Sequence, residues 1–98
     1  MGWADRAIAE LLAGDTTQVR PRGNSMQPRI SSGQLVTIEP AGVDAVDVGD
    51  AVLCRVSGRQ YLHIVKAKQA GRVLIGNNRG GINGWTRSVY GRVVSVED

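Results

Sequence analysis

Short runs in which apolar and polar residues alternate, separated by turn residues, fill most of the chain from residue 34 to its C-terminus. Alternation with a period of two predicts β-strands, because successive side chains of a strand point to opposite faces. Ser57 and Gly58 lie between two such runs and predict a hairpin turn. We therefore expect five strands, at residues 34–40, 50–57, 59–68, 71–77 and 88–96.

The N-terminal segment carries a different pattern, in which apolar residues recur with the period of a helix and Gly14 is a natural stop. The apolar stripe consists of Trp3, Ala7, Ile8, Leu11 and Leu12. At about three turns, such a helix is better suited to docking on its own domain or on a partner than to binding lipid. We expect residues 1–20 to form this amphipathic helix and a linker, and residues 21–98 to form one β domain.

Composition agrees with a small, turn-rich β domain. A chain of 98 residues supports one modest core. Phe is absent and Gly occurs thirteen times, so the core is expected to come from Val, Ile, Leu and Ala. The segment 76–85, GNNRGGINGW, has too few apolar residues for a strand and predicts an exposed loop. The expected fold class is mainly β: a small, partly closed antiparallel fold with one short N-terminal helix.

The charged and metal-binding residues argue against several classes of function. Twelve basic and nine acidic residues give a net charge of +3, and the arginines are scattered, so the nucleic-acid signal is weak. Cys54 is the only cysteine and His63 the only histidine, which excludes an internal disulfide and a zinc site built from these types. Cys54 is expected to be buried in its apolar strand, and no metal or cofactor is expected. No apolar run approaches the roughly 18–20 residues of a membrane span, so we expect a soluble, cytoplasmic protein.

One serine occupies a heavily constrained turn, in the sequence RGNSMQPRISSG. Gly23 and Asn24 tolerate left-handed backbone, and Pro28 fixes φ and removes a donor. Ser25 is thereby held, together with Met26, at the tip of a short loop. Two interpretations stay open from these residues: a hydroxyl that bonds its own backbone, as in many turns, or a nucleophile.

The parity of the strand at 59–68 limits which side chains can join such a serine. Alternate side chains of a strand share a face. The face of His63 also carries Tyr61 and Val65, whereas Lys66 points to the other face. His63 and Lys66 therefore cannot serve one site unless a bulge intervenes.

Four blocks of the sequence, taken in order, resemble the signal peptidase and LexA-type clan of serine peptidases. The blocks are GNSMQPRISSGQLVTI, DVGDAVLCRV, YLHIVKA and VYGRVVSV, and they span roughly residues 21–97. The resemblance implies a β fold of the LexA C-terminal and signal peptidase type.

The resemblance also implies roles for particular residues. Ser25 matches the nucleophile of the clan, and Met26 and Pro28 belong to the loop that forms the oxyanion and substrate-binding site. His63 falls where many members have a lysine base, and so resembles the members that pair serine with histidine. Lys66 is then a bystander. The implied substrate is an extended segment of a peptide or protein with small residues near the scissile bond.

Histidine-using members of the clan usually carry an acidic residue in a GDNN-like loop, which orients the imidazole. The matching stretch here is IGNNRGGING, which supplies Asn77 and Asn78, with Asn83 as a third candidate for holding His63. No carboxylate follows before Glu97. An amide can orient an imidazole, but it does not stabilise the imidazolium as a carboxylate does.

Three functions are compatible with these features. The first is a serine peptidase with Ser25 as nucleophile and His63 as general base. The second is a weakly active or inactive relative that acts as a dimerisation or regulatory binding module, so a homodimer stays open. The third is a nucleic-acid-binding β module, suggested by Trp85 near Arg87. Self-cleavage after Ala13 would resemble LexA-like proteins, but the short tether to the serine loop favours cleavage between molecules or none.

Overall fold

The computed structural model describes residues 2–98, which form one helix, one short 3₁₀ helix and seven strands. In chain order the elements are α1 (Asp5–Leu12), β1 (Thr17–Val19), β2 (Leu35–Pro40), η1 (Val43–Ala45), β3 (Ala51–Val56), β4 (Arg59–Gln69), β5 (Arg72–Gly76), β6 (Ile82–Thr86) and β7 (Ser88–Glu97). The expectation of a mainly antiparallel β fold with one short N-terminal helix is confirmed. No helix within residues 2–98 has the length and apolar character that a membrane crossing requires.

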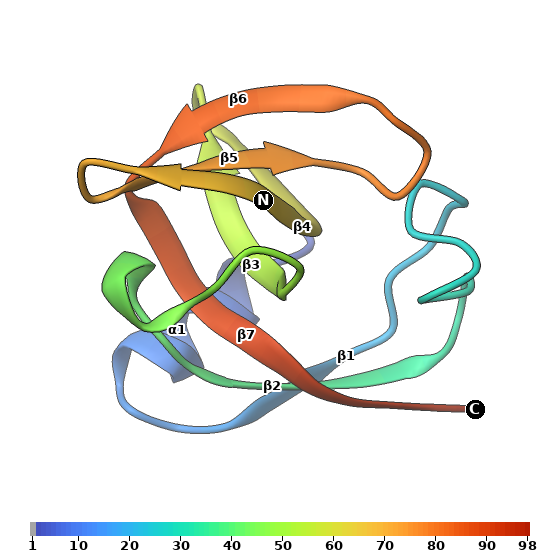
Figure 1. Ribbon diagram of the computed structural model, residues 1–98. Coiled ribbons are helices and arrows are strands. Elements are labelled where there is room, and N and C mark those ends of the chain that lie inside the picture. Colours follow the sequence, from blue (N-terminus) through green and yellow to red (C-terminus); the bar gives the residue numbers. More distant parts are fainter. Residues whose placement is uncertain (1) are drawn as a thin grey trace.

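All seven strands belong to one antiparallel sheet, in the order β1-β2-β7-β3-β4-β5-β6. The sheet bends strongly, so that β5 and β6 lie above β2 and β7 in the view of Figure 1. Across the described part of the chain the two edge strands, β1 and β6, do not pair with each other. The sheet is therefore open and not closed into a barrel.

Two of the seven strands were not expected from the sequence. All but the last residue of β6 lies within the segment predicted as a loop, and β6 pairs with β5 at one edge of the sheet, with Ile75 opposite Gly84. An edge strand has one neighbour and leaves side chains in solvent, so it needs few apolar residues. β1 lies in the predicted linker and pairs with β2, with Gln18 opposite Thr37. Its three residues are too few to show a period of two.

The hairpin between β3 and β4 is confirmed. Val56 pairs with Arg59, which leaves Ser57 and Gly58 as the two residues of the turn. Both have positive φ, of 50° and 83°, as a two-residue turn of type I′ requires. This turn sets the register of β4, and through it the position of His63 opposite Val52.

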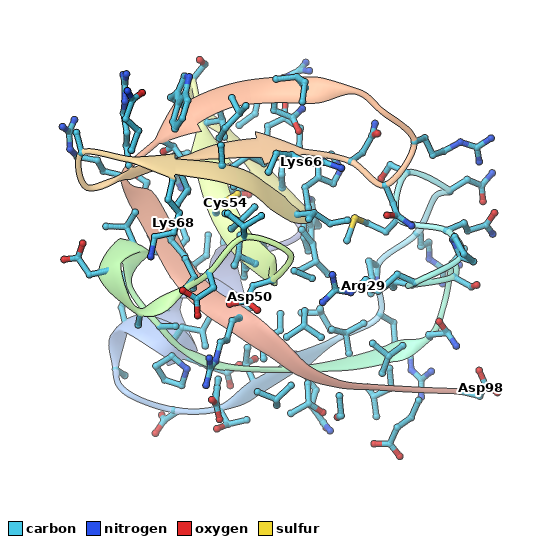
Figure 2. The ribbon with its side chains drawn as sticks, viewed as in Figure 1. Arg29, Asp50, Cys54, Lys66, Lys68 and Asp98 are labelled. Carbon is cyan, nitrogen blue, oxygen red and sulfur yellow. The ribbon has the colours of Figure 1, made fainter. Side chains whose placement is uncertain are left out.

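The sheet buries side chains on both of its faces. β3 is the central element, and its alternate residues enter two different clusters: Leu53 packs in the cluster that includes α1, while Val52 and Cys54 pack in the other. Cys54 is fully buried, as expected, and Figure 2 shows it in the interior of the fold. Burial raises the pKa of its thiol to about 12.

Helix α1 packs on the sheet through part of its apolar stripe. Its buried residues are Ala7, Ile8 and Leu11. The contact with β7 is close, because a Cβ at Gly91 would lie 3.0 Å from Leu11 Cδ1 and 2.7 Å from the carbonyl oxygen of Glu39. Two members of the predicted stripe are not covered: Trp3 is 54% exposed and Leu12 is 72% exposed.

Candidate functional site

The serine loop is fixed by hydrogen bonds between its own residues. The amide of Gly33 donates to the carbonyl oxygen of Pro21 at 2.8 Å and closes the base of the loop. The amide of Ile30 donates to the carbonyl oxygen of Met26 at 2.9 Å, and both side chains are buried in the core. These anchors below and beside Ser25 hold its position while leaving its side chain partly accessible.

Ser25 and His63 come together from distant parts of the sequence. The Oγ atom of Ser25 lies 3.1 Å from the Nε2 atom of His63, within hydrogen-bond distance. The imidazole is largely buried, and it stacks on the ring of Tyr61 with 5.0 Å between the ring centroids. The expected shared face of Tyr61 and His63 is therefore observed.

The second ring nitrogen of His63 determines which tautomer is present. His63 Nδ1 lies 2.7 Å from the Oδ1 atom of Asn83, in β6. A carbonyl oxygen only accepts hydrogen bonds, so Nδ1 carries the proton and Nε2 presents a lone pair. Nε2 therefore accepts from the hydroxyl of Ser25, which is the orientation that a general base requires.

The other two candidate asparagines have different positions. Asn77 uses Oδ1 to accept from the amides of Arg79 and Gly81, at 2.8 Å each, and so shapes its own turn. Asn78 bonds to the serine loop: its amide N–H donates to the carbonyl oxygen of Ser25 at 2.8 Å, and its Nδ2 donates to that of Gln27 at 2.9 Å. In Figure 1 the light-blue to cyan serine loop lies close to the orange connection between β5 and β6.

Burial is the largest influence on the charge of His63. It lowers the pKa of the imidazole below its ordinary value of 6.5. The hydrogen bond that Nδ1 donates to Asn83 raises the pKa, and the positive charge of Lys66 lowers it further. At neutral pH the imidazole is therefore uncharged and can accept a proton.

Lys66 lies at an irregularity of β4. The pairing of β4 with β5 shifts register between Val65 and Ala67, so Lys66 has no partner residue there. Gly76 has no Cβ atom, but one placed there would lie 3.1 Å from Cε of Lys66. The lysine side chain therefore lies against β5. Within residues 2–98, Lys66 forms no hydrogen bond with Ser25 or His63, although its charge acts on the imidazole.

A cavity of about 490 Å³ opens beside the serine and histidine. Met26 and Leu62 contribute apolar surface to it, while Pro28 is not part of its lining. Trp3 and the segment 20–23 form another part of the wall. Sequence reasoning did not associate Trp3 with the site, because its helical spacing indicated packing and nothing in the pattern indicated a cavity.

Among the residues described, no three His, Cys, Asp or Glu side chains gather as a metal site would need.

The fold and the family comparison agree on the class of protein. The chain folds as an open antiparallel sheet that carries this serine loop, and its family match lies in the signal peptidase and LexA-type clan of serine peptidases. A family model described as Peptidase S24-like matches residues 6–83, a range that includes Ser25, His63 and Asn83. The chain belongs to the Peptidase S24-like family. No curated protein sequence gives a significant match to it.

Proposed function

We propose that this protein is a serine peptidase in which Ser25 is the nucleophile and His63 the general base. The observation that carries the proposal is the 3.1 Å contact between Ser25 Oγ and Nε2 of His63, with Asn83 holding the opposite side of the ring. A serine hydroxyl is a poor nucleophile until a neighbouring base takes its proton. The uncharged imidazole is such a base at neutral pH.

The reaction then proceeds in two halves. His63 Nε2 takes the proton of Ser25 as Oγ attacks the scissile carbonyl carbon and forms a tetrahedral oxyanion. Nε2 gives that proton to the leaving amine, the C–N bond breaks, and an acyl ester on Ser25 remains. Water gives a proton to Nε2 and attacks the ester carbonyl carbon. The C–O bond to Ser25 then breaks, Nε2 returns the proton to Oγ, and the carboxylic acid product is released.

Stabilisation of the oxyanion is assigned to backbone N–H groups of the serine loop. The amides of Ser25 and Met26 are the candidates, because an oxyanion hole is commonly built from the nucleophile and its neighbour. Pro28 lacks an N–H group, so its role is restricted to shaping the loop. A peptide bound in the cavity would lie extended between the segment 20–23 and the start of β4, with a small residue beside Ser25.

The neutral partner of His63 sets an upper limit on the expected rate. Asn83 holds the ring in the productive tautomer but adds no negative charge when the imidazolium forms. In one well-studied triad, loss of the acidic member costs a factor on the order of 10⁴ in kcat, mainly through the wrong tautomer. Because Asn83 keeps the correct tautomer, the cost here is smaller, and slow turnover is the expected behaviour.

Labelling of the serine tests this function directly. A fluorophosphonate probe forms a covalent bond with an activated serine, and intact mass spectrometry followed by peptide mapping locates it. We expect modification of Ser25 in the native protein and its loss in Ser25→Ala and His63→Ala. Ser88→Ala, which removes an exposed serine at the start of β7, is the matched control and keeps full labelling. Equal labelling of the native protein and His63→Ala would overturn the assignment of the base.

A second function is favoured by the same neutral asparagine. Without a carboxylate behind His63, the fold could bind a peptide segment and release it uncleaved, as a regulatory module. In that case Ser25→Ala and His63→Ala bind peptide as the native protein does, and the probe leaves Ser25 unmodified. The labelling experiment therefore separates the two functions.

A further inference from the structure

A second hollow, of about 460 Å³, lies next to the cavity beside Ser25. The two hollows share Trp3 and Arg20 in their walls. Trp3 comes from the segment before α1, and Arg20 follows β1, so the N-terminal part of the chain forms the boundary between them. We use the term basic groove for the two hollows together.

The charged side chains that line the basic groove all have the same sign. They are Arg20, which borders both hollows, Arg22 in the first and Arg6 in the second. Among residues 2–98, no aspartate or glutamate lines either hollow. The ion pairs found in residues 2–98 join Lys68 to Asp47 and Arg92 to Glu39, so none of the three arginines is neutralised by a carboxylate.

The guanidinium groups also have free donors. Arg20 uses Nη1 to donate to the carbonyl oxygen of Gly33 at 2.8 Å, which orients its side chain and leaves its other N–H groups available. Arg22 and Arg6 are exposed. A guanidinium held in place loses little freedom when a carboxylate binds it with two hydrogen bonds.

The apolar part of the groove indicates what kind of ligand would bring carboxylates to these arginines. Trp3 is 54% exposed and presents its indole to both hollows, where an apolar or aromatic side chain can pack on it. Met26 and Leu62 add apolar surface near Ser25. A polypeptide provides both acidic and apolar side chains along one extended chain, and the first hollow of the groove contains Ser25 and His63, the site of the proposed cleavage.

We propose that the basic groove recognises an acidic peptide, and that Arg20, Arg22 and Trp3 are specificity-determining residues. This inference rests on the proposed function for its biological meaning, because it names the substrate class of the same site. The preferred segment has a small residue at Ser25 and one or more Asp or Glu residues on the side toward Trp3. Nucleic acid is the competing anionic ligand, and it is disfavoured because the groove ends at a serine–histidine pair.

Binding is measured on Ser25→Ala, so that cleavage is not needed for the readout. Isothermal titration calorimetry compares three peptides of equal length with the same Ala-Gly centre, flanked by Asp and Glu, by Ser and Gln, or by Lys and Arg. We expect the acidic peptide to bind best, and its advantage to shrink as salt shortens the Debye length from about 30 Å at 0.01 M to about 8 Å at 0.15 M. Equal affinities for the three peptides, or tighter binding of a single-stranded oligonucleotide, would overturn the proposal.

Charge reversal identifies the residues responsible. Arg22→Glu is expected to weaken binding of the acidic peptide by about two- to tenfold, and addition of Arg20→Glu to weaken it further. Arg87→Glu changes the net charge equally at a position outside the groove and keeps the affinity. Thermal unfolding shows whether reversal of Arg20 disturbs the loop. If it does, Arg22→Glu alone decides the question, since the side chain of Arg22 is exposed.

Substitution of Trp3 separates apolar contact from charge. Trp3→Ala is expected to weaken binding of all three peptides by the same factor, whereas the arginine variants change the order of their affinities.

Cleavage assays on the native protein distinguish the two proposals from each other. Preferred binding of the acidic peptide without any cleavage contradicts the peptidase function and leaves the basic groove in place. Equal cleavage of all three peptides supports the peptidase function and overturns the acidic preference.

Discussion

Asn83 Oδ1 and Ser25 Oγ bind the two opposite nitrogens of the same imidazole, at 2.7 Å and 3.1 Å. The histidine is therefore held between an acceptor and a donor, which fixes both its tautomer and its direction. Because Asn83 lies on the edge strand β6 and Ser25 on a loop before β2, the arrangement depends on the fold of both ends of the sheet.

Replacement of the amide by a carboxylate should raise activity. We expect Asn83→Asp to increase kcat by about tenfold or more, because a carboxylate stabilises the imidazolium that forms in the transition state. It should also raise the pKa of His63, so that the acid limb of the pH–rate profile moves to higher pH. Asn83→Leu, which removes the acceptor, should lower kcat. Equal rates for Asn83→Asp and Asn83→Leu would show that this contact does not contribute.

Removal of the neighbouring cation should leave most of the activity. Lys66 lowers the pKa of His63 through its charge and forms no hydrogen bond with Ser25. We expect Lys66→Ala to keep kcat within a few-fold of the native value at pH 8 and to move the acid limb of the profile slightly upward. A loss as large as that of His63→Ala would show that the lysine is the base.

The depressed pKa of His63 links stability to acidity. Between the lowered pKa of the native protein and the ordinary value of 6.5, the unfolded chain binds a proton that the native protein does not. The contribution of His63 is therefore intact above pH 6.5, and it is lost as the pH falls through the native-state pKa, by at most about 1.4 kcal/mol per pH unit. Urea unfolding at several pH values should show this slope in the native protein and a flatter dependence in His63→Gln. The same dependence of stability on pH in both proteins would contradict the assignment of this slope to His63.

The contact between Asn78 and the serine loop should matter for turnover. Asn78→Ala deletes the Nδ2 bond to the carbonyl oxygen of Gln27, which is worth about 0.5–1.5 kcal/mol of stability. We expect kcat to fall as well, because the backbone of Ser25 becomes less well placed. Asn77→Ala is the matched control, since Asn77 shapes the same turn without contacting the serine loop. If the two variants lower kcat equally, both asparagines act by shaping the turn, and the contact of Asn78 with the serine loop has no separate effect.

The purified protein should keep its full length on storage. The amide of Ala13 donates to the carbonyl oxygen of Ala9, and that of Gly14 to Leu11, so the bond between Ala13 and Gly14 is held at the end of α1. Trp3 lines the cavity and precedes the N-terminal end of α1, whereas the Ala13–Gly14 bond lies at the C-terminal end. Eight helical residues span about 12 Å, so the helix separates this bond from the Trp3 side of the cavity. Intact mass after incubation at several concentrations should stay constant. A fragment that begins at Gly14, formed at a rate independent of concentration, would show cleavage within one molecule.

The strands with a clear period of two were predictable, and the edge strands were not. β3 and β4 are rich in apolar residues and joined by Ser57-Gly58, so pattern and turn both indicate a hairpin. β6 is stabilised by the backbone of β5, and such pairing leaves little trace in side-chain type.

The unpredicted strand β6 also limited what could be predicted about the site. Ser25 and His63 were indicated by local residues and by the resemblance, whereas the choice of Asn83 over Asn77 and Asn78 depends on a strand that the sequence did not reveal.

The burial of Cys54 makes this protein convenient for chemical modification. With a thiol pKa of about 12 and no exposed surface, its only native cysteine should resist alkylation at neutral pH. A cysteine introduced at position 25 would then be the single reactive thiol of the chain, next to an imidazole that accepts its proton. Ser25→Cys can therefore carry a spectroscopic label or an affinity tag at the proposed nucleophile without any further change to the sequence.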